Sequence, residues 1–83
     1  MNVPVDTVII FNTAGDMKIN FIRIEDENHE LHTYKVENIE FIKDESHAGF
    51  KSLLFGCNIL LDGCMKCIKI RYLIESHKWI LVG

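Results

Sequence analysis

The Asp62-Gly63 pair constrains this chain more than any other feature, because runs of alternating apolar residues lead up to it and away from it. Asp-Gly suits both positive-φ positions of a type I′ turn, which joins two antiparallel strands through two residues. Leu61 is then expected to pair with Cys64, and the register of a hairpin formed by residues 50–61 and 64–74 follows. The further expected pairs are Ile59 with Lys66, Cys57 with Ile68 and Phe55 with Ile70.

Other clusters of turn-forming residues divide the rest of the chain at 13–16, 26–30, 44–49 and 75–77. Ile, Val, Thr, Phe, Tyr and Trp make up 28 of the 83 residues, against two Ala and no Gln, which favours strands over helices. Gly56 within one strand, and the broken alternation at Phe21-Ile22 within another, suggest bulges or bends. We predict an all-β single domain over residues 1–83, a small antiparallel barrel or β-roll of about six meander strands. The expected strands span 3–11, 17–25, 31–42, 50–61, 64–74 and 78–82, and a helical turn within 44–49 is left open.

Side chains alternate between the two faces of a strand, so the hairpin register also assigns faces. A turn at Ser76-His77 would place Ile74 beside Trp79 and Tyr72 beside Leu81. One face is then apolar except for Lys66, and we expect it to be the core. Its members are Leu53, Phe55, Cys57, Ile59, Leu61, Cys64, Ile68, Ile70, Tyr72, Trp79 and Leu81.

The opposite face of the last three strands is also largely apolar, although Asn58 interrupts it. Antiparallel sheets usually have one apolar and one polar face, so a second apolar face needs cover. That cover is either another copy of the chain, in a homodimer or other homo-oligomer, or residues 1–12 folded back; another protein is a further possible partner. The predicted interface comprises Leu54, Leu60, Met65, Lys69, Arg71, Leu73, Ile80 and Val82, with Cys67 on the same face.

Charge is distributed unevenly along the chain. Residues 1–50 carry ten acids and four bases, a net charge of −6, whereas residues 51–83 carry two acids and five bases, a net charge of +3. Lys69, Arg71 and Lys78 therefore suggest an alternative function, a regulatory barrel that senses nucleic acid or a small ligand. The nearby aromatic residues, Tyr72 and Trp79, are expected in the core, which weakens that interpretation.

Three cysteines without framework spacing indicate free thiols in a reducing cytoplasm. Cys64 and Cys67 form a CxxC pair, which leaves a metal-thiol protein as a further alternative. Residues three apart on a strand point to opposite faces, so we expect Cys64 to face inward and Cys67 outward, and we predict no metal site. A site built from His29, His32 and a carboxylate is also imaginable, but these residues read more simply as a solvated turn.

Several function classes are not expected. The Ser46-His47 and Ser76-His77 pairs lack the geometry of a nucleophile and its base, and the chain has no phosphate-binding or hydrolase motif, so we predict neither an enzyme nor a cofactor. The longest apolar runs are far shorter than the roughly 20 residues of a membrane span, and the first residues lack the pattern of a signal peptide.

Two stretches resemble known groups. Residues 21–31, continuing through Val36 and Ile39, resemble short uncharacterised bacterial proteins with a single β-rich domain, and this implies a fold but no activity. Trp79-Ile80-Leu81 is similar to the Trp-Tyr-Leu signature of WYL domains, which are small Sm-like or SH3-like barrels in bacterial transcriptional regulators. That likeness implies a small barrel and, more distantly, a regulatory role; Ile80 replaces the signature Tyr, and no binding residues carry over.

Overall fold

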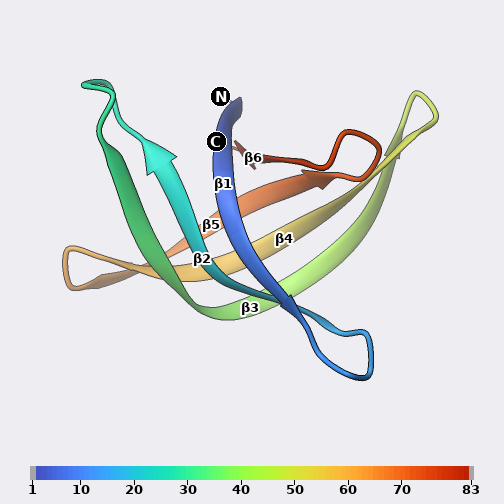
Figure 1. The fold of residues 1–83 in the computed structure, drawn as a ribbon, viewed down its shortest axis with the longest axis horizontal. Coiled ribbons are helices and arrows are strands. Elements are labelled where there is room, and N and C mark those ends of the chain that lie inside the picture. Colours follow the sequence, from blue (N-terminus) through green and yellow to red (C-terminus); the bar gives the residue numbers. More distant parts are fainter. Residues whose placement is uncertain (1, 83) are drawn as a thin grey trace.

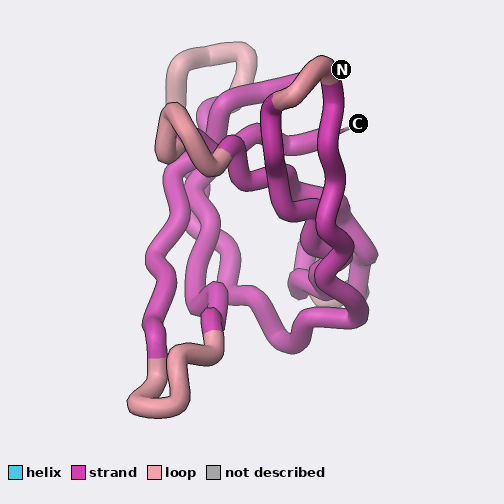
Figure 2. The backbone as a smooth tube through the Cα atoms, turned by 90° about the vertical axis from the view of Figure 1, so that its right-hand side faces the viewer, coloured by secondary structure: helices cyan, strands magenta, loops and turns pink. Residues whose placement is uncertain are grey.

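Six strands follow one another along the chain and around a closed antiparallel barrel, in the order β1-β2-β3-β4-β5-β6 (Figure 1). The computed structural model describes residues 2–82. The strands are β1 (Asn2–Phe11), β2 (Met17–Glu25), β3 (Leu31–His47), β4 (Phe50–Leu61), β5 (Cys64–Leu73) and β6 (Lys78–Val82). Figure 2 shows strands joined by short loops. The predicted all-β meander of six strands is confirmed.

Within residues 2–82 there is no helix with the length and apolar character needed to cross a bilayer.

The barrel closes because β1 and β3 each pair with different neighbours along their length. β1 pairs with β6 through residues 2–5 and with β2 through residues 6–11. β3 pairs with β2 through residues 31–35 and with β4 from Val36 to His47. β1 and β3 therefore each take part in two sheets, one that contains β2 and one that contains β4, β5 and β6. The core lies between these two sheets.

Bulges allow the strands to bend at these crossings. The register between β1 and β2 shifts between Val8 and Ile9, which leaves Asn20 as the extra residue of β2. Ile19 and Ile22, on either side of Asn20, are consequently both buried. The sequence predicts this bulge one residue later, at Phe21-Ile22. β3 contains two more extra residues, Glu37 and Glu40, opposite β4.

The hairpin at Asp62-Gly63 forms in the predicted register, with Leu61 opposite Cys64 and Phe55 opposite Ile70. Both turn residues have positive φ, 51° and 78°, as a type I′ turn requires. The buried core consists of Val5, Ile19, Ile22, Val36, Phe55, Cys57, Ile59, Ile70 and Trp79. Of the other predicted core residues, four pack against this cluster while partly exposed: Leu53, Ile68, Tyr72 and Leu81.

Residues 44–49 differ from the prediction of a loop or a helical turn. β3 continues to His47, and a two-residue turn at Ala48-Gly49 places His47 opposite Phe50. Ala48 and Gly49 have φ values of 52° and 84°, so this turn resembles the one at Asp62-Gly63. Residues 44–47 form a regular strand although their side chains are charged or polar. Cross-strand hydrogen bonds join backbone groups and do not depend on apolar side chains.

The β5–β6 connection is longer than predicted. Four residues, 74–77, form the turn, and Tyr72 pairs with Trp79 rather than with Leu81. Ile74 lies in the turn and has no strand partner. A shift of two residues leaves every side chain on its original face, so the predicted faces hold although the register is wrong.

Gly56 marks a close approach rather than a bulge. It lies on the outer face of β4, opposite Phe41 of β3, and a Cβ atom at this position would overlap the Phe41 ring. The extra residues of this region belong to β3. The absence of a side chain therefore allows the Phe41 ring to approach the β4 backbone closely.

We expect Gly56→Ala to lower the free energy of unfolding by about 1 kcal/mol, because the new methyl group displaces the Phe41 ring. In a Phe41→Ala background the same substitution should have little cost, which urea denaturation of the two single variants and the double variant would measure. An equal cost in both backgrounds would contradict the assigned contact.

Candidate functional site

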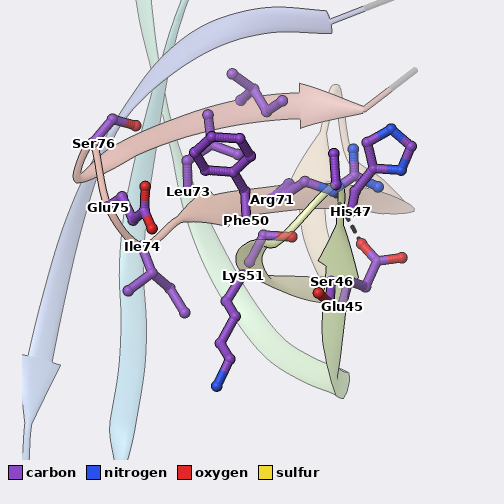
Figure 3. Close-up of a pocket in the computed structure, with 13 residues that line it drawn as sticks. Glu45, Ser46, His47, Phe50, Lys51, Arg71, Leu73, Ile74, Glu75 and Ser76 are labelled. Carbon is purple, nitrogen blue, oxygen red and sulfur yellow. Dashed lines mark hydrogen bonds and ion pairs between the residues drawn. The ribbon is translucent and has the colours of Figure 1, made fainter.

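A hollow lies on the outer face, between the tip of the β3–β4 hairpin and the β5–β6 turn (Figure 3). Its volume is about 810 Å³, within the range of small-molecule and side-chain pockets. Apolar walls come from Phe50, Leu73, Ile74 and Ile80. Phe50 is 62% exposed, so its ring stands largely in solvent.

A partly buried ion pair forms the polar end of this pocket. Arg71 Nε donates to Glu45 Oε1 at 3.0 Å, and each side chain is 28% exposed. Within the described side chains, Arg71 makes no other hydrogen bond. The two charges compensate one another beside the apolar walls, which avoids the cost of an unpaired, partly buried charge there.

Part of the predicted interface meets at this pocket. Arg71, Leu73 and Ile80 line it directly. Leu54 lies beside them because Leu54, Arg71 and Ile80 occupy one row across β4, β5 and β6. Lys69 and Val82 occupy the next row, opposite Gly56. The apolar members Leu54, Leu73, Ile80 and Val82 are each partly buried.

The structure separates the other two predicted interface residues from this group. Leu60 and Met65 pair with one another near the Asp62-Gly63 turn, and they are 49% and 57% exposed. Asn58 lies between the two groups, and its Nδ2 donates to Asn38 Oδ1 at 3.0 Å and to Glu40 Oε1 at 2.6 Å. This polar cluster divides the outer face, so the predicted interface is not one continuous surface.

Sequence reasoning missed the hairpin side of the pocket. Glu45, Ser46, His47 and Phe50 were assigned to a loop or a strand end, yet all of them line the pocket. The available signal was Ala48-Gly49, which can form a two-residue turn and would have extended the strand to His47.

A second apolar patch, also missed, lies on the outer face of the β1–β2 hairpin. Val8 and Phe21 are directly opposite one another, and Ile10 follows on β1. Their exposed fractions are 55%, 40% and 48%. The Asp62-Gly63 register assigns faces only to the last three strands, so it gives no face to the residues of β1 and β2.

A second hollow, of about 550 Å³, opens between β1 and the β5–β6 turn. Tyr72 and Trp79 form part of its wall with their ring centroids 4.7 Å apart, and Tyr72 Oη lies 2.8 Å from His77 Nδ1. Trp79 is buried and Tyr72 is partly exposed. Both rings are therefore held at the edge of the core, as the predicted faces require.

The Ser-His pairs are separated by the fold. Ser46, His47 and Ser76 line the outer pocket, whereas His77 bonds to Tyr72. Within residues 2–82, no hydrogen bond joins a serine hydroxyl to an imidazole in this pocket, so the described geometry holds no nucleophile against a base.

The three cysteines occupy different environments. Cys57 is buried in the core, whereas Cys64 and Cys67 are exposed. Cys64 was predicted to face the core, and this is wrong because its thiol is exposed. Cys64 lies next to the turn, beyond the buried core. Among the described residues, neither exposed thiol is grouped with two further metal-ligating side chains. Burial, and to a smaller extent the nearby Cys67, raises the pKa of the Cys57 thiol to about 11.

We expect Cys57 to resist thiol reagents in the folded protein. With a pKa of about 11, roughly one thousandth of this thiol is ionised at pH 8, and the core also blocks access. Titration with an aromatic disulfide reagent should modify two thiols rapidly and the third only in denaturant. A Cys64→Ser/Cys67→Ser variant should be inert while folded, and rapid modification of that variant would contradict the buried position.

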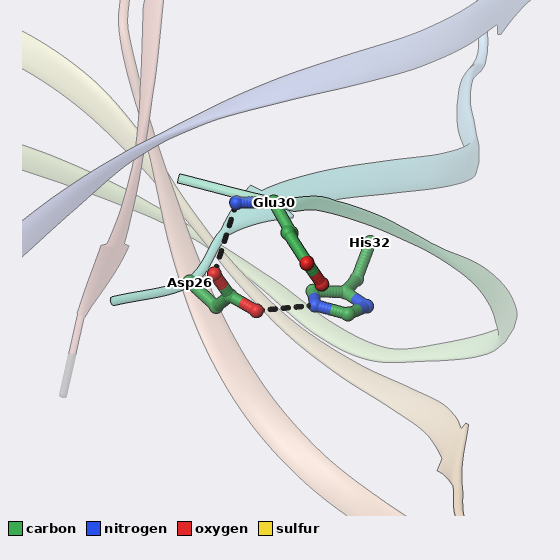
Figure 4. Close-up of side chains that lie close together, drawn as sticks. All are labelled: Asp26, Glu30 and His32. Carbon is green, nitrogen blue, oxygen red and sulfur yellow. Dashed lines mark hydrogen bonds and ion pairs between the residues drawn. The ribbon is translucent and has the colours of Figure 1, made fainter. Parts of the chain in front are cut away.

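The grouping of possible metal ligands within residues 2–82 is Asp26, Glu30 and His32, at the β2–β3 turn (Figure 4). One ligand atom from each lies within 4.8 Å of the others. His29, which the sequence placed in a possible site, is not among them. Asp26 Oδ1 accepts the backbone N–H groups of Asn28 and Glu30 at 2.8 and 2.9 Å, and Oδ2 lies 2.7 Å from His32 Nε2.

These contacts shape the hairpin. Asn12 in the β1–β2 turn accepts N–H groups two and four residues later, as Asp26 does, so one turn geometry recurs with either an amide or a carboxylate. The His32 hydrogen bond, followed by that of the Glu30 N–H, lowers the pKa of Asp26 below its ordinary 3.8. We therefore assign these residues a role in the turn.

This assignment predicts an acid dependence. Because the folded pKa of Asp26 is lowered, its contribution to stability is present above pH 3.8 and is lost as the pH falls through the folded value. Carboxyl carbon chemical shifts from NMR should show Asp26 titrating below 3.8, and His32→Ala should move its pKa upward. Asp26→Asn should keep the turn, as Asn12 does, without this acid dependence. A pKa of 3.8 or above for Asp26 in the wild-type protein would contradict the assigned role of Asp26 in the turn.

Comparison with known proteins adds no relative. No family model matches the chain, and no curated protein and no solved structure matches it.

Proposed function

We propose that this protein acts by binding, and that its first partner is a second copy of itself, held through the outer face of β4, β5 and β6. The observation that carries the proposal is the apolar pocket on that face, together with the partly buried Leu54, Leu73, Ile80 and Val82 around it. An apolar centre bordered by charged groups such as Lys69 and Arg71 is typical of protein interfaces.

The path of the chain supports this interpretation. All six described strands form the barrel wall, and residues 2–5 pair with the edge of β6 instead of lying over the outer face. The intramolecular cover that the sequence allowed, residues 1–12, is therefore used elsewhere. Within residues 2–82 no segment is left to shield this face, and each Å² of apolar surface removed from water contributes about 25 cal/mol.

The alternative, an anion-binding barrel that uses Lys69, Arg71 and Lys78, has weaker support. Arg71 is already paired with Glu45, and the charges of Lys51 and Glu75 offset one another, so the residues lining the same pocket carry no net positive charge. Phosphate-driven binding would also weaken steeply with added salt, whereas apolar association would not.

We further propose a cytoplasmic location, which the two exposed thiols and the buried one support because free thiols persist in reducing compartments. A relationship to SH3-like barrels belongs to the same proposal. Its support is the small closed meander and the Trp79-Ile80-Leu81 sequence.

Leu73→Asp should abolish self-association without unfolding the barrel. The substitution places a charge in the centre of the proposed interface, while Leu73 itself lies outside the buried core. Sedimentation equilibrium at protein concentrations on the order of tens of micromolar should show a dimer or larger assembly for the wild type and a monomer for the variant. Circular dichroism should show the same strand content for both proteins.

Val8→Asp is the matched control, since Val8 is an exposed apolar residue on the outer face of a different hairpin. It should leave the assembly intact. A monomeric wild-type protein would refute the proposal, and so would an assembly that Val8→Asp disrupts and Leu73→Asp does not.

A further inference from the structure

The β2–β3 turn brings together three side chains that can each offer an atom to a metal ion: Asp26, Glu30 and His32. These three atoms all lie within 4.8 Å of one another, and His32 Nε2 is 2.7 Å from Asp26 Oδ2. Figure 4 shows the Glu30 carboxylate beside the His32 ring. Imidazole nitrogen and carboxylate oxygen are both zinc ligands in proteins, so this group is more than a cluster of acids.

The turn holds two of these ligand atoms in place. Asp26 Oδ1 accepts the backbone N–H groups of Asn28 and Glu30, which fixes the carboxylate with Oδ2 toward His32. His32 lies in β3, and its ring is stacked beside that of Tyr34 with 6.5 Å between the centroids. One oxygen of Asp26 therefore builds the turn while the other faces the imidazole. Ligands that are already oriented lose less conformational freedom when an ion binds.

The charge of the turn favours a cation. Residues 25–32 contain four acidic residues and two histidines but no Lys or Arg, on a chain whose net charge is −3. Within residues 2–82 the ion-pair partners of these acids are His29 and His32, which are neutral unless protonated. No fixed positive charge thus balances the turn, and its negative field attracts a divalent ion.

The separations suit a single zinc ion. Bonds of about 2.1 Å place two ligands of a tetrahedral ion about 3.4 Å apart, so the Asp26–His32 contact of 2.7 Å must open by about 0.7 Å. Neutral His32 can carry its one ring proton on Nδ1, which leaves Nε2 free to bind the ion. The Glu30 side chain is exposed, so it can rotate to complete the set of three protein ligands.

We propose that Asp26, Glu30 and His32 bind one divalent transition-metal ion of the zinc class at the β2–β3 turn, with water in the remaining coordination positions. The imidazole favours Zn²⁺ over Mg²⁺ and Ca²⁺, which prefer oxygen ligands. This proposal departs from the sequence-based prediction of no metal site. The three residues lie outside the outer pocket and the proposed interface, so the ion site does not depend on self-association.

Zinc chloride added to the Cys64→Ser/Cys67→Ser protein tests the site without competition from the exposed thiols. Isothermal titration calorimetry should show one ion bound per chain. Nitrogen NMR should show the largest zinc-dependent shifts at the His32 ring and at the amide groups of Asn28 and Glu30. Magnesium chloride at the same concentration should not move the His32 ring nitrogens, because Mg²⁺ does not favour imidazole.

Variants in the same background separate the ligands from their neighbours. His32→Ala and Glu30→Gln should each weaken zinc binding at least about tenfold. His29→Asn is the matched control, since it removes an imidazole of the same turn that is 87% exposed and outside the cluster. Asn tolerates the φ of 61° at this position, and the variant should change zinc affinity less than about threefold. Circular dichroism should show the same strand content for all three variants.

Four results would overturn the site. One is the lack of saturable binding with zinc chloride up to about 1 mM. A second is equal weakening by His29→Asn and His32→Ala, which would mean that any nearby imidazole attracts the ion. A third is magnesium binding as tight as zinc binding, which would leave only the negative charge of the turn as its cause. The fourth is a set of zinc-dependent shifts centred on His47 or His77 instead of His32.

Discussion

Closure of the barrel depends on two strands that each serve two sheets. β1 joins β6 to β2, and β3 joins β2 to β4, so both strands must change direction where they change partner. The extra residues Asn20, Glu37 and Glu40 provide the bends. Because of the bulge at Asn20, the side chains of Ile19 and Ile22 are both buried in the core. Because every described strand is needed for the wall, the chain gains a closed core and leaves its outer face uncovered.

Much of this fold follows from the sequence, because side-chain alternation is a strong constraint. Asp62-Gly63 sets one register, and that register assigns Phe55, Cys57 and Ile70 to the core. The assignment even survives the wrong register between β5 and β6, since a two-residue shift preserves faces. Turn length was the weak point: no local rule distinguishes a turn centred on Ser76-His77 from the observed turn that begins at Ile74.

The candidate site was less predictable, because it depends on where strands end in space. Arg71, Leu73 and Ile80 were predicted from their position on the outer face of the last two strands. The opposite wall of the pocket comes from a hairpin whose charged residues resemble a loop. Periodicity says which side of a strand is apolar, and it does not say how far a hairpin projects beyond its neighbours. The same limit explains Cys64, which has the parity of a core residue but is exposed, because it lies next to a turn at the end of β5, beyond the buried core.

The edge of β3 bears on whether a strand edge would compete with the outer face as the surface for the association proposed above. β2 leaves β3 after Lys35, and from Val36 to His47 the register gives β3 only β4 as a neighbour among the described strands. An open edge of this kind invites pairing with a strand of another molecule. The bulged Glu37 and Glu40 interrupt its hydrogen-bonding pattern and place acidic groups along it. Glu40 also binds Asn58, which fixes the polar boundary of the outer patch. The residues that bend β3 thus also disfavour edge pairing and separate the apolar surface at the pocket end of β4 and β5 from Leu60 and Met65 at the other end.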